Sequence, residues 1–169
     1  MTNRDVMKKH LLEKVCAPLL AKGFTGQFPH YRKICENSIE LVTFQTNKHG
    51  GSFTVELSAV FPHHPNKNCA EDIIDPNTVT VWDTNERYRL PGMFDGWFYY
   101  RDVYEKRIFG LGKTYFDIDE KSTALPFPKC RLVQKFDEER ANDICCEINK
   151  QLIKAFRWLA KFEKKKQNA

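Results

Sequence analysis

The segment FPHHPNKNCAED, residues 61–72, gathers side chains whose types could do chemistry. Five of them carry donor atoms that bind metal ions: His63, His64, Cys69, Glu71 and Asp72. Adjacent histidines diverge, and the spacing does not match a metal signature such as H-E-x-x-H. We therefore expect no metal here and interpret the segment as a surface turn. A site of one histidine with Cys69 is the alternative, because the prolines allow the chain to reverse.

A second group of chemically capable residues lies in WDTNERYRLPGMFDGWFYYR, residues 82–101. Arg87 and Arg89 share one face of a predicted strand 86–90, and Trp97 and Tyr99 follow. Arginine together with aromatic residues is typical of binding hot spots and of stacking on bases. The same residues also suit the edge of a core with arginine stems lying over it. We take all four as candidate binding residues, together with His63 and His64.

Catalytic patterns are weak elsewhere. If residues 115–119 form a strand, Asp117 and Asp119 share one face and could hold a Mg²⁺ ion, but a solvated strand edge is the simpler interpretation. There is no G-x-S-x-G, and neither KHGG nor GLGK completes a phosphate-binding loop. The sequence therefore indicates no catalytic residues, no metal site and no cofactor.

The sequence predicts two helices, one near each end of the chain, that would pack against the elements carrying these candidate residues. Residues 4–22 carry apolar side chains at helical spacing, with Pro18 expected to bend or restart the helix and Gly23 to end it. Residues 137–164 carry a longer apolar stripe, with Asp137 as a plausible N-cap.

Between these helices the chain reads as strands. Residues 39–47 and 52–61 flank the turn KHGG, and the second strand alternates cleanly, so this hairpin is the clearest prediction. Residues 28–35, 78–82, 86–90 and 113–119 are further strand candidates. Strands that follow one another without intervening helices predict an α+β fold. We expect an antiparallel sheet, a hairpin or meander, packed against an N-terminal helix and a long C-terminal helix.

Composition bounds the class of protein. The 169 residues suit a single domain, 1–169, with a short basic tail from about residue 163. The net charge of +5 is mild, and a fraying helix end explains the lysines of the tail, which argues against nucleic-acid contact. The sequence has no apolar run long enough to span a membrane, and its N-terminus does not have the pattern of a secretory signal. The six cysteines have no C-x-x-C spacing, so we expect reduced thiols. We expect a cytoplasmic protein that does not contact membranes.

The ordered series of motifs resembles a bacterial family known as domain of unknown function 4304. The likeness rests on GF at 23–24, FQ at 44–45, FTVEL at 53–57 and R-x-R-L before a tryptophan, and it covers most of the chain to about residue 100. The resemblance implies a small intracellular bacterial α+β protein, and it brings no reaction and no catalytic residues. Gln45 is the polar residue of interest on a matching position, and we expect this strand glutamine to satisfy buried backbone groups.

Two classes of function follow. The leading hypothesis is a non-enzymatic module that binds a partner protein, for example an immunity-type inhibitor of a toxin. The alternative is an enzyme acting on a phosphate-bearing or nucleic-acid substrate, in which His63 or His64 meets Arg87 and Arg89 across a cleft. A nucleic-acid module using the basic tail is the third possibility.

Overall fold

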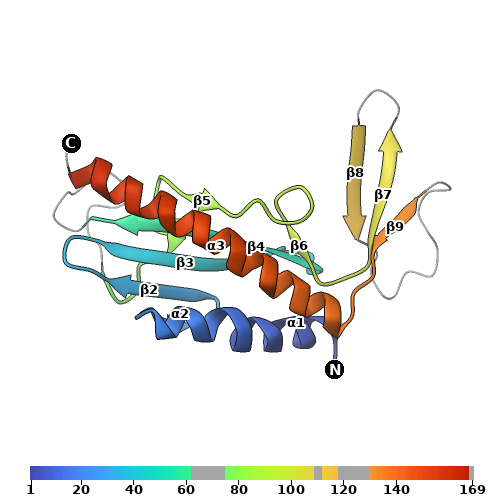
Figure 1. The fold of residues 1–169 in the computed structure, drawn as a ribbon, viewed down its shortest axis with the longest axis horizontal. Helices are drawn as coiled ribbons and strands as arrows, with labels where there is room; N and C mark the ends of the chain where they lie inside the picture. Colours follow the sequence, from blue (N-terminus) through green and yellow to red (C-terminus); the bar gives the residue numbers. More distant parts are fainter. Residues whose placement is uncertain (62–74, 109–111, 118–129, 168–169) are drawn as a thin grey trace.

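The computed structural model describes residues 1–61, 75–108, 112–117 and 130–167. Helices from the two ends of the chain cover one face of an antiparallel sheet (Figure 1). This arrangement confirms the predicted α+β class. Among the described residues, no helix combines the length and apolar character that crossing a membrane requires.

The N-terminal helical segment consists of α1 (Asn3–Leu11), the π-helical turn η1 (Leu12–Cys16) and α2 (Ala17–Ala21). A capping box starts it, because the Thr2 hydroxyl accepts from the Asp5 amide and the Asp5 carboxylate accepts from the Thr2 amide. Gly23 ends the segment with φ of +88°, as expected for a helix C-terminus.

Pro18 shapes the middle of this segment. A proline has no N–H, so the carbonyl four residues earlier, that of Lys14, loses its usual helical partner. The π-helical turn lies directly before the proline, and the Lys14 carbonyl accepts a hydrogen bond of 2.9 Å from the Asn149 side chain. The expected restart thus takes the form of a wider turn whose free carbonyl is satisfied by the C-terminal helix.

The main sheet has the strand order β1-β2-β3-β4-β5, and β6 also pairs with β4. Its strands are β1 (Thr25–Gln27), β2 (His30–Ile34), β3 (Ile39–Thr46), β4 (Ser52–Val60), β5 (Tyr88–Arg89) and β6 (Phe98–Tyr99). The β3–β4 pair confirms the predicted hairpin, and β5 confirms a shorter version of the strand expected at 86–90.

The two faces of this sheet differ in character. On the inner face, Phe53, Val55 and Leu57 of β4 join the core formed with the helices. Every second residue points the other way, so Thr54, Glu56 and Ser58 lie on the outer face. A small apolar cluster also lies there, made by Ile39, Leu41, Val60, Val79 and Val81.

The expectation of a strand at residues 78–82 was wrong. Thr80 instead caps the short 3₁₀ helix η2 (Val81–Asp83). The Asp83 carboxylate accepts from the Thr80 amide at 2.7 Å and from its hydroxyl at 2.9 Å. This local capping box competes with strand pairing, and Val81 remains buried on the outer face of the sheet.

A second sheet, of order β8-β7-β9, projects from one end of the molecule (Figure 1). It contains β7 (Val103–Ile108), β8 (Gly112–Asp117) and β9 (Arg131–Gln134). Of these, only β8 overlaps a predicted strand, and β7 and β9 were not expected. The long helix α3 (Glu138–Gln167) follows β9 and crosses the main sheet, close to the bounds predicted from sequence.

Candidate functional site

A row of polar side chains crosses the outer face of the main sheet. His30 on β2, Thr43 on β3, Glu56 on β4 and Arg89 on β5 are successive partners in the strand register. Side chains directly opposite each other on neighbouring strands point to the same face and can touch. We call these four residues the polar row.

Glu56 is the buried centre of the row. Its side chain is only 5% exposed, and its Oε1 lies 2.7 Å from Nη2 and 2.9 Å from Nε of Arg89. The pair is a two-nitrogen contact to one oxygen, which fixes the guanidinium in direction. The guanidinium carbon of Arg89 lies 5.7 Å from the ring centroid of Trp97, within cation–π range.

Arg87 approaches the same carboxylate from the loop side. Its Nη1 lies 3.8 Å from Oε2 of Glu56, a longer contact than that of Arg89. Its Nε donates to the Thr84 carbonyl and its Nη2 to the Trp82 carbonyl, both at 3.0 Å. Arg87 therefore ties the η2 segment to the sheet, while 38% of its side chain stays exposed.

The other end of the row pairs His30 with Thr43 and Trp82. The His30 Nδ1 lies 3.1 Å from the Thr43 hydroxyl oxygen, and its ring meets the Trp82 ring edge-on at 4.9 Å between centroids. Burial and the nearby charge of Arg32 lower the pKa of His30, so its neutral form dominates at pH 7. Trp82 is 47% exposed and presents its indole beside the row.

The turn that carries Trp97 is held from the helix side. Gly92 has φ of +70°, and a Cβ there would lie 2.5 Å from backbone atoms of Gly96 and Trp97. The Gln151 side chain, on α3, donates to the Gly92 carbonyl at 3.0 Å and accepts from the Gly92 amide at 3.2 Å. This two-bond contact fixes the position of the turn beside Arg89.

The remaining predicted residues lie apart from this group. Gln45 is on the outer face but pairs with Thr54, one step along the hairpin from the polar row. Tyr99 pairs with Ser52 and is 8% exposed, and burial, with Asp117 and Asp95 adding to it, raises its pKa. We therefore interpret Gln45 and Tyr99 as residues that stabilise the sheet and not as residues that contact a ligand.

The family comparison matches residues 15–107 to a model described as Domain of unknown function (DUF4304). The match covers more than half of the chain and confirms the resemblance. The chain belongs to this family. No curated protein and no solved structure matches the chain. The whole polar row of this DUF4304 protein, with Arg87 and Trp97, falls inside the matched range.

Some predicted residues of the DUF4304 protein cannot be placed in this site. His63, His64 and Asp119 lie outside the described residues. Asp117 is on β8 of the second sheet, where its Oδ2 lies 3.3 Å from Nη1 of Arg101. Within the described ranges, no three histidine, cysteine or acidic side chains gather as a metal site requires.

Sequence reasoning missed Glu56 and His30, and it included Trp82 in the group at 82–101 without selecting it as a binding residue. A signal for Glu56 was present, because it is the single charged residue in the strand SFTVELSAV. A charge inside an otherwise apolar or small strand needs a partner of opposite sign. Arg87 and Arg89, spaced by two in the predicted strand 86–90, were the available partners on one face.

Proposed function

We propose that this DUF4304 protein is a non-enzymatic module that binds a partner protein through Arg87, Arg89, Trp82 and Trp97, which we call the Arg/Trp surface. The observation that carries this proposal is the buried carboxylate of Glu56, which holds two partly exposed guanidinium groups in place. Trp97 lies against one of them, and the indole of Trp82 is half-exposed.

Arginine and tryptophan dominate the energetics of many protein interfaces. Their cost in binding is the ordering of long side chains, about 0.5–1.5 kcal/mol each. Here folding already restricts these side chains, because hydrogen bonds fix Arg87 and Arg89 before a partner binds, so less conformational entropy is lost on binding. Two cations against one carboxylate leave a net positive charge, so the partner surface we expect is acidic.

The same contacts argue against the enzyme alternative. Glu56 is engaged by two arginines and is poorly placed to act as a general base. Thr43, whose hydroxyl lies beside His30, is 1% exposed and is not presented to a substrate. Asp117 pairs with Arg101 on the second sheet rather than joining Arg87 and Arg89.

A finer form of the proposal is an inhibitor of the immunity type, which covers an acidic region of a toxin in the bacterial cytoplasm. The free thiols of Cys16, Cys35, Cys130, Cys145 and Cys146 support a reducing compartment. A toxin gene beside the gene of this protein would supply the partner to purify.

The test compares binding of that purified partner by isothermal titration calorimetry. We expect the double variant Arg87→Ala/Trp97→Ala to weaken binding at least about 100-fold, which corresponds to two hot-spot residues. The matched control, Lys154→Ala/Arg157→Ala, removes exposed cations from α3 and should leave the affinity unchanged. Equal loss in both variants, or none in the first, would overturn the proposal.

A further inference from the structure

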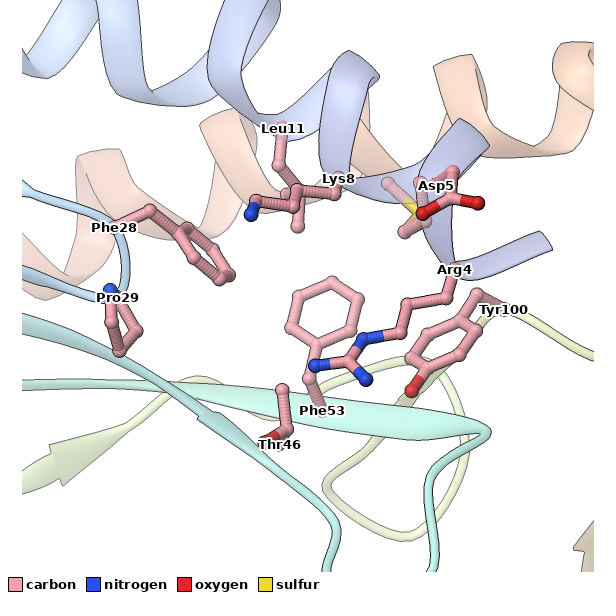
Figure 2. Close-up of a pocket in the computed structure, with 10 residues that line it drawn as sticks. Arg4, Asp5, Lys8, Leu11, Phe28, Pro29, Thr46, Phe53 and Tyr100 are labelled. Carbon is pink, nitrogen blue, oxygen red and sulfur yellow. The ribbon is translucent and has the colours of Figure 1, made fainter. Parts of the chain in front are cut away.

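A hollow of about 440 Å³ lies between α1 and one end of the main sheet, on the opposite face from the Arg/Trp surface (Figure 2). This volume falls within the range of about 300–1,000 Å³ that is typical of small-molecule sites. Its apolar lining comes from Met7 and Leu11 of α1, from Phe28, and from Phe53 and Tyr100.

Two cationic side chains enter this hollow. Arg4 and Lys8 are four residues apart on α1 and therefore share a face of the helix. Both extend from the helix toward the sheet, Arg4 toward Phe53 and Tyr100 and Lys8 toward Phe28 (Figure 2). The Lys8 amine lies 5.8 Å from the centroid of the Phe28 ring.

Neither cation forms an ion pair in the part of the chain that the structure describes, although the charge of Arg4 contributes to lowering the pKa of Asp5. Asp5 lies at the rim, but the Thr2 amide and hydroxyl donate to its carboxylate at 3.0 and 2.7 Å. These hydrogen bonds lower the pKa of Asp5 and keep it engaged in the helix cap. The charged residues that line the hollow are therefore two cations and one carboxylate engaged in the helix cap, and the N-terminal amine adds a positive charge near Asp5.

We propose that the hollow binds a small amphipathic carboxylate, with its apolar or aromatic body against the rings and its charge between Arg4 and Lys8. A carboxylate can accept hydrogen bonds from both the Arg4 guanidinium and the Lys8 amine, while an apolar body matches the rings of the lining. Thr46 and Tyr100 also line the hollow, and each carries a hydroxyl group that can donate or accept a hydrogen bond. This site is independent of the Arg/Trp surface, and its residues Arg4 and Lys8 lie outside the range matched by the family model.

The experiment titrates 4-phenylbutyrate into the full chain and follows backbone amides by NMR, with 4-phenylbutanol as the neutral counterpart. We expect the carboxylate to bind and to shift the backbone amides of α1, Phe28 and Thr46, and the alcohol to bind at least about tenfold more weakly. Arg4→Met and Lys8→Met keep the apolar stem and should each weaken the carboxylate about tenfold.

Lys9→Met is the control, because Lys9 is on the same helix and does not line the hollow. It should bind as the unmodified chain does, and thermal unfolding of all three variants checks that the fold is kept. Equal binding of acid and alcohol, no binding of either, shifts confined to another surface, or an equal loss in Lys9→Met would each overturn the proposal.

Discussion

Glu56 and Arg89 form an ion pair that joins the buried outer face of β4 to the protein surface. The carboxylate is 5% exposed and the guanidinium side chain 47%, with 2.7 Å between Oε1 and Nη2. A buried carboxylate needs its cation more than the exposed cation needs the carboxylate. Removal of Arg89 and removal of Arg87 should therefore lower the free energy of unfolding by different amounts.

We predict that Arg89→Ala lowers the free energy of unfolding by about 1–3 kcal/mol, since it leaves Glu56 without its closest donor. Arg87→Ala should cost less of this electrostatic contribution, because its contact with Glu56 is 3.8 Å. Urea denaturation measures both. In double-mutant cycles with Glu56→Gln, the coupling to Arg89 should exceed the coupling to Arg87, and equal couplings would contradict this account.

A second prediction concerns the carbonyl that Pro18 leaves free. Asn149 donates to the Lys14 carbonyl at 2.9 Å, so Asn149→Ala should lower the free energy of unfolding by about 1 kcal/mol. Pro18→Ala restores an N–H that can bond to that carbonyl within the helix. Asn149→Ala should then cost measurably less in the Pro18→Ala background. An unchanged cost in urea denaturation would show that the two residues act independently.

The sequence predicted the elements whose pattern is local and strong. The hairpin at 39–47 and 52–61 followed from alternation, and α3 followed from its apolar stripe. Residues 78–82 were misjudged because Thr80 and Asp83 satisfy each other, a capping contact that outweighs β propensity.

The candidate site was only half predictable, for a physical reason. Arg87, Arg89 and Trp97 stood out by residue type, and they do gather. Glu56 and His30 join them only through strand register, which places residues 30, 43, 56 and 89 in one row. Register depends on long-range pairing that no single segment reveals. The hollow at Arg4 and Lys8 likewise needs the packing of α1 on the sheet.

A third prediction concerns alkaline pH. Burial raises the pKa of the Cys145 thiol to about 12, and it also raises the pKa values of Cys16 and Tyr31. An unfolded cysteine has a pKa of about 8.5. Above that pH the unfolded chain releases protons that the folded chain keeps, so the stability present below pH 8.5 is lost as pH rises toward 12.

The free energy of unfolding should therefore fall between pH 8 and pH 10, by up to about 1.4 kcal/mol per pH unit for each such thiol. Urea denaturation at both values measures the slope. Cys145→Ala removes one titrating group and should flatten the slope, whereas Cys146→Ala, at an exposed position, should leave it as it was. The same slope in all three proteins would exclude Cys145 as a source.

The fourth prediction tests how α3 positions Trp97. The Gln151 side chain makes two hydrogen bonds with the Gly92 backbone and also donates to Glu147 at 2.9 Å. Gln151→Leu leaves the Gly92 amide and carbonyl without these partners, and we expect the free energy of unfolding to fall by about 1–3 kcal/mol. The loss should be local to the turn that carries Trp97.

Amide hydrogen exchange separates this local loosening from general destabilisation. In Gln151→Leu, the amides of Gly92, Met93 and Trp97 should exchange faster, since Met93 and Trp97 bond within the same turn. The β3–β4 amides should change only in step with global stability. Lys150→Ala, at the exposed neighbouring position, is the control, and the amides of the turn should exchange at the same rate in this variant as in the unmodified chain. If exchange in the turn is unaltered in Gln151→Leu, the position of Trp97 beside Arg89 is set by the turn alone and not by α3.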